Sequence, residues 1–258
     1  MPVQIPDDSD FSSFKDQCLS TDGWISHYNK GGVTVWCQEE ESKTVQKLKM
    51  RIVCKDVTAA TLYDVLHDTG YRRKWDTNMI DTYDIGRLTV NADVGYYSWK
   101  CPSPLKNRDF VTMRSWLPLG NDYLIINYSV KHPQHPPKKD YVRAVSLLTG
   151  YLIQYNGANC CTLYYLTQVD PRGSLPKWVV NRLSQFVAPK VKPADSGSCP
   201  LRSRWRTRLC PIVSHCVSVL PGHEEDLQGV SEVSGVEEEA QPKPEAVDVP
   251  GAERAAVH

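Results

Sequence analysis

Strand-length segments in which apolar and polar residues alternate recur between residues 24 and 169, and they commit the chain to a fold built on a β-sheet. The clearest segment lies at residues 45–53, where Leu48, Met50 and Ile52 alternate with lysine and arginine. A period of two places successive side chains on opposite faces of a strand, so that one face is buried and the other is exposed. We predict strands at residues 24–28, 33–37, 45–53, 80–88, 93–101, 108–117, 122–131, 140–155 and 162–169.

Short helices are predicted before and between these strands. Asp8 or Ser9 is a suitable N-cap for a helix near the N-terminus. Thr58 is a suitable N-cap for a helix over residues 59–67, and a further short helix is predicted over residues 71–78. Because the helices are few and the strands form long runs, the pattern indicates an α+β fold.

A last helix is predicted over residues 175–190. Pro176 suits its first turn, and Pro193 ends it because proline lacks a backbone donor and clashes with the preceding turn. Its apolar face consists of Trp178, Val179, Leu183, Phe186 and Val187. After residue 190 the composition changes to an arginine-rich run and then to an acidic, proline- and alanine-rich end, so we predict a disordered tail over residues 191–258.

The charge balance and the cysteines exclude several classes of protein. The 30 Lys and Arg residues equal the 30 Asp and Glu residues, whereas a general nucleic-acid binder carries a basic excess. No run of about 18 apolar residues occurs, and no secretory segment follows Met1, so we expect a cytoplasmic protein with reduced thiols. The nine cysteines form no C-x-x-C motif, and His132 and His135 lie in a proline-rich loop where we expect them to be exposed. We therefore predict neither a metal site nor a cofactor.

The stretch from Tyr71 to Asp109 holds the strongest candidates for a binding site. It begins with YRRKWD, in which Arg72 and Asp76 are four residues apart and can pair on one helix face. An arginine at the inner end of an apolar pocket can hold a phosphate, because its planar fork of donors matches phosphate oxygens. The competing interpretation is an ordinary surface ion pair.

The run LYDVLHDTGYRRKWDTN, followed by LTVNADVGYYSWKCP and PLKNRD, resembles START (StAR-related lipid transfer) domains, and among them the phosphatidylcholine-transfer type. The resemblance covers about residues 7–190. It implies a helix-grip fold, in which a curved antiparallel sheet of about nine strands surrounds a C-terminal helix and encloses a lipid tunnel. It also implies a non-enzymatic, monomeric carrier that moves phosphatidylcholine and/or phosphatidylethanolamine between membranes in a closed hydrophobic pocket.

The resemblance also assigns roles to individual residues. It implies that Arg72 contacts the lipid phosphate, with Asp76 beside it. Family members hold choline in an aromatic cage, and at the matching positions this chain has Tyr97, Phe110 and Leu147, so the cage is incomplete and a smaller headgroup such as ethanolamine has room. The remaining pocket candidates are Thr149, as a polar acceptor, and Leu66. The competing interpretation of the two aromatics is core packing between strands.

Two further regions are candidates for membrane contact. Leu105 and Lys106 form an apolar tip with a basic flank in a proline-rich loop, which suits transient contact with a membrane surface as a peripheral protein. An ordinary packed turn is the competing interpretation. Trp178 and Phe186 on the last helix are candidates for the lid. Because this helix is shorter than the family's, we expect weaker lipid retention and lower stability than in a member with the full helix.

Two other functions stay open at this point. The first is a hydrolase-type enzyme on a helix-grip fold, although the sequence contains neither G-x-S-x-G nor H-E-x-x-H. The second is a transfer-defective form that binds lipid weakly. In each case the ligand is a phospholipid, and no nucleic acid is expected as a partner.

Overall fold

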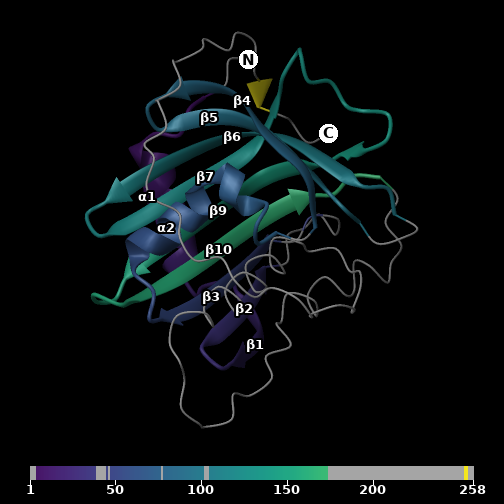
Figure 1. Cartoon of the computed structure of the whole chain (residues 1–258). Helices are drawn as coiled ribbons and strands as arrows, with labels where there is room; N and C mark the ends of the chain where they lie inside the picture. Colours follow the sequence, from purple (N-terminus) through teal and green to yellow (C-terminus); the bar gives the residue numbers. More distant parts are fainter. Residues whose placement is uncertain are drawn as a thin grey trace.

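The computed structural model describes residues 4–38, 45, 47–76, 78–101, 105–173 and 253–254, and an antiparallel sheet forms most of this part of the chain (Figure 1). The strand order is β1-β2-β3-β10-β9-β7-β6-β5-β4. All pairs along this path are antiparallel. The strands are β1 (Ile25–Lys30), β2 (Val33–Gln38), β3 (Lys47–Lys55), β4 (Met79–Thr89), β5 (Ala92–Trp99), β6 (Arg108–Leu119), β7 (Asp122–Lys131), β9 (Val145–Tyr155) and β10 (Cys160–Asp170).

The predicted α+β class is confirmed, and each predicted strand corresponds to one on this path. The prediction over residues 140–155 is wrong in one respect, because the segment contains two strands. The short β8 (Val142–Arg143) pairs in parallel with β6, and β9 begins after it. A further short strand, β11 (Glu253–Arg254), pairs with the end of β7 and was not predicted. The predicted last helix, with Trp178 and Phe186, lies outside the described residues.

The helices are fixed by side-chain caps at their first turns. Helix α1 (Asp8–Leu19) is capped by Asp7, one residue before the predicted cap, because the Asp7 carboxylate accepts from the backbone of Ser9 and Asp10. Helix α2 (Ala59–His67) is capped by Thr58, as predicted. The next helix, α3 (Thr69–Arg72), begins earlier and is shorter than predicted.

The early start of α3 has a local cause. The sequence Asp68-Thr69-Gly70 lies between the two predicted helices and was assigned to neither of them. Instead the Asp68 side chain accepts a hydrogen bond from the backbone amide of Tyr71 at 2.8 Å, so Asp68 ends α2 and also caps α3. This double role turns the chain sharply and sets Arg72 at the end of a four-residue helix.

Two hydrophobic clusters occupy opposite faces of the sheet. Residues that follow each other in β9 alternate between them: Ile153 packs with Leu62 and Leu66 of α2, whereas Leu152 packs with Phe11 and Phe14 of α1. Helix α2 therefore covers one face and α1 covers the other. The face under α2 is the one on which the predicted site residues meet.

Gly150 of β9 lies where α1 comes closest to the sheet. A Cβ atom at this position would overlap the carbonyl oxygen of Ile125 and lie 2.7 Å from the Phe14 ring. We expect Gly150→Ala to lower the free energy of unfolding by about 1–3 kcal/mol, as overpacked core substitutions do. Urea denaturation measures this loss. Gly95→Ala is the matched control, because its Cβ would lie 3.5 Å from the carbonyl oxygen of Tyr83, an ordinary contact. Equal losses in the two variants would contradict the prediction.

Candidate functional site

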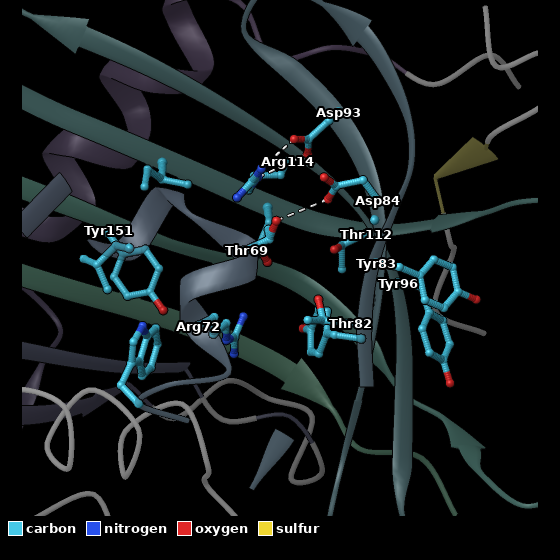
Figure 2. Close-up of a pocket in the computed structure, with 16 residues that line it drawn as sticks. Thr69, Arg72, Thr82, Tyr83, Asp84, Asp93, Tyr96, Thr112, Arg114 and Tyr151 are labelled. Carbon is cyan, nitrogen blue, oxygen red and sulfur yellow. Dashed lines mark hydrogen bonds and ion pairs between the residues drawn. The ribbon is translucent and has the colours of Figure 1, made fainter. Parts of the chain in front are cut away.

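A cavity of about 60 Å³ lies between the sheet and helices α2 and α3 (Figure 2). Its lining combines apolar and aromatic side chains with an unusual number of polar and charged ones. Three of the predicted site residues line it, namely Leu66, Arg72 and Tyr97. The lining residues that were not predicted include Thr69, Tyr83, Asp84, Asp93, Tyr96, Thr112, Arg114, Asn127 and Tyr151.

The predicted pair of Arg72 and Asp76 is present and is buried. Nε and Nη2 of Arg72 donate to Oδ2 of Asp76 at 3.2 and 3.1 Å. The Asp76 side chain is fully buried, and that of Arg72 is 20% exposed, so the pair is not the surface ion pair of the competing interpretation. Burial works to lower the pKa of Arg72, but the charges of Asp76 and nearby tyrosines outweigh it and raise that pKa. The guanidinium therefore stays charged inside the cavity.

Aromatic rings surround this guanidinium. The Cζ atom of Arg72 lies 5.6 Å from the ring centre of Trp75, 5.2 Å from that of Tyr97 and 5.9 Å from that of Trp99. Phe110 stacks on Tyr97 with their ring centres 4.7 Å apart. Cation–π attraction and the ion pair together hold Arg72 in one place. Within the described residues, Nη1 of Arg72 has no hydrogen-bond partner and stays available to an anion.

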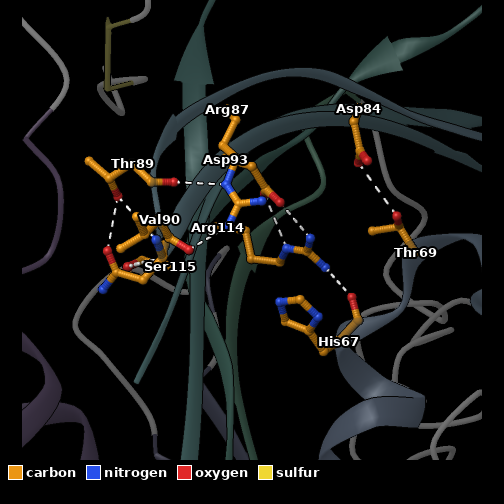
Figure 3. A network of polar contacts seen from close by, with 10 residues as sticks. His67, Thr69, Asp84, Arg87, Thr89, Val90, Asp93, Arg114 and Ser115 are labelled. Atoms are coloured by element: carbon orange, nitrogen blue, oxygen red, sulfur yellow. Dashed lines mark hydrogen bonds and ion pairs between the residues drawn. The ribbon is translucent and has the colours of Figure 1, made fainter. Parts of the chain in front are cut away.

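A second ion pair lies in the same cavity and was missed from the sequence (Figure 3). Nε and Nη2 of Arg114 on β6 donate to the two carboxylate oxygens of Asp93 on β5, at 3.1 and 2.5 Å. Nη1 of Arg114 donates to the backbone carbonyl of His67, the last residue of α2, at 2.6 Å. The sequence did contain a signal for this pair, because the even spacing of Asp93 and Tyr97 places both side chains on the same face of the strand. A charge on the inward face of a buried strand indicates a buried partner.

The structure places the other predicted residues away from the cavity lining. Thr149 is buried, and its hydroxyl hydrogen-bonds to those of Ser146 and Thr167 at 3.0 and 2.9 Å. Leu147 is half-buried. In the predicted membrane loop, Leu105 is half-buried and Lys106 is exposed, and the residues just before Leu105 lie outside the described part of the chain. The roles of these four residues stay predictions.

Asp109 and Arg108, at the start of β6, have separate partners. The Asp109 carboxylate accepts from Arg143 through two hydrogen bonds of 2.9 Å. Arg108 donates to three backbone carbonyls.

The expectation that His132 and His135 are exposed is wrong. His132 is only 5% exposed and His135 is half-buried, and their rings pack together with centres 5.0 Å apart.

His67 gives the structure a predictable response to acid. Burial and the nearby positive charge of Arg114 lower the pKa of His67 from its ordinary value of 6.5 to about 4. Between these two values the unfolded chain binds a proton that the folded chain does not, so stability falls as the pH decreases through this window. We expect His67→Phe, which keeps the ring contacts with Tyr63 and Trp116, to reduce this loss.

Urea unfolding at about pH 7.5 and about pH 5 measures the effect of this change. The control is the same substitution at His27, which is exposed. A pH dependence that is unchanged in His67→Phe, or reduced equally by His27→Phe, would contradict the assignment to His67.

Two searches within the described residues gave negative results. No group of three or more His, Cys, Asp or Glu side chains is arranged to hold a metal ion there. In the same part of the chain, no helix is both long enough and apolar enough to cross a bilayer.

The chain is similar to known proteins over most of its length. The START domain pattern matches residues 6–192. START domain-containing protein 10 of Mus musculus is 60% identical over 210 residues, which cover 81% of this chain and 72% of that protein. Phosphatidylcholine transfer protein of Mus musculus is 26% identical over 162 residues, 61% of this chain and 75% of the relative.

A solved structure agrees with these sequence matches. The crystal structure of human STARD10 aligns with a TM-score of 0.70 and 63% identity, covering 73% of this chain and 77% of that one. The predicted helix-grip fold of START domains is therefore confirmed. By the extent of the domain match and by its identity to these relatives, the chain belongs to the START domain family.

Proposed function

We propose that this protein is a non-enzymatic carrier that binds a phospholipid, phosphatidylcholine and/or phosphatidylethanolamine, and transfers it between membranes. The observation that carries the proposal is Arg72, a charged guanidinium that is held inside the cavity with one nitrogen free of partners among the described residues. A buried cation next to apolar walls suits a ligand that joins a phosphate to acyl chains. The relative named phosphatidylcholine transfer protein supports the same ligand class.

The energetics of the acyl chains support enclosure of the ligand. Two chains carry on the order of 30 methylenes, and at ~0.8 kcal/mol each their exposure to water would cost more than about 20 kcal/mol. Pockets for drug-sized ligands measure about 300–1,000 Å³, so the cavity of about 60 Å³ has to widen before it holds a phospholipid. We assign this widening to Leu105 and Lys106 in the loop and to Trp178 and Phe186 in the helix predicted from the sequence, where transient contact with a membrane would open the lid.

The headgroup pocket is proposed to favour a small ammonium group. Tyr97 already stacks on Phe110 and lies under the Arg72 guanidinium, so its ring is engaged before any ligand arrives. Leu147 and Thr149 lie on β9, which β7 separates from β6, and we assign them to the headgroup pocket that forms when the cavity widens. An ammonium with hydrogens gains more from hydroxyl acceptors than a quaternary ammonium does, which supports phosphatidylethanolamine as a ligand beside phosphatidylcholine.

The proposal also covers the boundaries and the setting of the domain. Residues 7–190 form the lipid-binding unit, and residues 191–258 form a tail. The carrier works as a monomer in the cytoplasm and meets membranes at their surface, without a metal, a cofactor or a nucleic acid.

Native mass spectrometry of the protein purified from cells tests the function. We expect a one-to-one adduct with an intact phosphatidylcholine or phosphatidylethanolamine, identified after release in organic solvent. Cleaved lipid in the adduct would support a hydrolase instead. Protein that is empty, and that fills only after residues beyond 190 are replaced by a full-length helix, would identify this chain as a transfer-defective form.

A further inference from the structure

A second group of titratable side chains lies on the sheet face opposite the cavity's Arg72. Tyr96 and Tyr97 are consecutive residues of β5, so their side chains point to opposite faces of the sheet. The Tyr96 ring packs in the hydrophobic cluster under α1. Tyr83 of β4 stacks on Tyr96 with ring centres 4.8 Å apart. In Figure 2 both rings lie on the far side of β4 and β5 from Arg72. We call these two stacked rings, Tyr83 and Tyr96, the floor of the group, because the basic side chains lie over them.

Basic side chains from the segment after β7 cover this floor. The Tyr83 hydroxyl and Nδ1 of His135 are 3.3 Å apart, in hydrogen-bond contact. The ring of His135 packs against that of His132. Nζ of Lys138 lies 3.9 Å from the ring centre of Tyr96, so that its charge is held over the same floor. Three basic groups therefore converge from a stretch of seven residues.

Asp109, the acidic group that acts on Lys138 among the described residues, is already paired. Asp109 is fully buried, and both of its carboxylate oxygens accept from Arg143. Besides burial, the groups that lower the pKa of His135 are His132, Lys138 and Arg143, all of them basic. On the other side, Tyr96, Tyr83 and Asp109 act on Lys138 and raise its pKa. A proton on His135 would thus meet mainly positive charge.

The unmet hydrogen bonds of His132 indicate that this cluster lacks a ligand. Its side chain is 5% exposed, and neither of its ring nitrogens has a hydrogen-bond partner in the described part of the chain. Buried polar atoms are almost always hydrogen-bonded, and an unmet one lowers stability. An anion beside His132, His135 and Lys138 would accept from the ring N–H groups, favour the charged imidazole with two donors and balance the positive charge.

We propose that His132, His135 and Lys138, none of which lines the lipid cavity, form an anion site for phosphate-type ligands. The site lies at the end of the sheet that also carries the loop with Leu105 and Lys106, because β6 begins there beside the end of β7. A phosphate monoester on a membrane lipid and free phosphate offer the same chemistry. The two sources are separated by experiment.

Nitrogen-15 NMR of the histidine rings in the full chain tests the site, with inorganic phosphate as the probe and chloride at equal ionic strength as the reference. We expect phosphate to shift the ring signals of His132 and His135 saturably and to raise the pKa of both imidazoles by about 1, because an anion within hydrogen-bond reach favours their charged form. The exposed His27 is the internal control and should not change.

Two lysine variants make the test specific. Lys138→Gln should weaken phosphate binding about 10-fold, since a charge-assisted contact is lost. Lys139→Gln, which changes the exposed neighbouring lysine, should leave binding unchanged. Thermal melting of both variants checks that the fold is retained. Equal shifts in chloride, equal shifts at His27, or equal weakening by the two variants would overturn the proposal.

Vesicles then distinguish the two sources of phosphate. The first set contains phosphatidylcholine alone, and the second also contains phosphatidic acid, whose headgroup is a phosphate monoester. Stronger binding to the second set that is lost in Lys138→Gln and is competed by inorganic phosphate identifies a lipid headgroup as the ligand. Histidine shifts with free phosphate, without this vesicle preference, identify a soluble phosphate. These results are independent of whether the cavity holds a phospholipid.

Discussion

Replacing Asp76 with leucine is expected to lower the free energy of unfolding by about 3–5 kcal/mol, because it leaves the Arg72 guanidinium buried without its partner. The Asp76 side chain is fully buried, so water cannot replace the lost carboxylate. Urea denaturation measures the loss. The double variant Arg72→Leu/Asp76→Leu should recover most of it, because two apolar side chains leave no uncompensated charge.

The neighbouring pair of Arg73 and Asp81 is the matched control. It has a similar contact, with Nη2 of Arg73 2.9 Å from Oδ1 of Asp81, but its side chains are 54% and 46% exposed. Asp81→Leu should therefore lower stability by less than about 1 kcal/mol. Similar losses for Asp76→Leu and Asp81→Leu would show that burial does not set the strength of the Arg72–Asp76 pair.

Phospholipid binding should fall at least about 10-fold in the double variant Arg72→Leu/Asp76→Leu, because a hydrogen bond to a charged phosphate contributes about 1.5–3 kcal/mol. The double variant suits this measurement because a single change at either residue would also lower stability, and the loss of binding could then reflect unfolding. Diacylglycerol, which has the same acyl chains and no phosphate, should bind the double variant as well as it binds the original protein. Titration with fluorescent analogues of both lipids measures the two affinities.

The control for binding is the double variant Arg73→Leu/Asp81→Leu, which removes an exposed pair of the same kind. It should leave the preference for phospholipid over diacylglycerol intact. If the Arg72→Leu/Asp76→Leu protein keeps that preference, Arg72 does not bind the phosphate and the proposed function loses the observation that carries it.

Local patterns were enough to predict most of the fold. Alternation defined the strands because a sheet with one buried face requires it. Thr58 identified the start of α2, and the four-residue spacing of Arg72 and Asp76 identified their pair, because both depend on residues within one helical turn. The start of α3 was missed, since the turn residues Asp68-Thr69-Gly70 can end one helix and begin the next with equal ease.

Contacts across the sheet could not be predicted in the same way. Asp109 and Arg143 are 34 residues apart in the sequence and 2.9 Å apart in space, because the parallel pairing of β8 with β6 brings them together. Asp93 and Arg114 meet because they are register partners in β5 and β6. A one-residue change of register would separate both pairs, and the sequence alone does not specify register to that accuracy.

The contact of Arg114 with the last carbonyl of α2 has a consequence for motion. It fixes the C-terminal end of that helix to β5 and β6 through charge-assisted hydrogen bonds. Because this end of α2 is held to the sheet, we expect it to move least when the cavity widens. Displacement is then concentrated at the opposite rim, and collective movements of this type take microseconds to milliseconds. For the proposed carrier, we therefore expect movement at the rim farthest from Arg114, rather than movement of α2, to set the rate of lipid exchange.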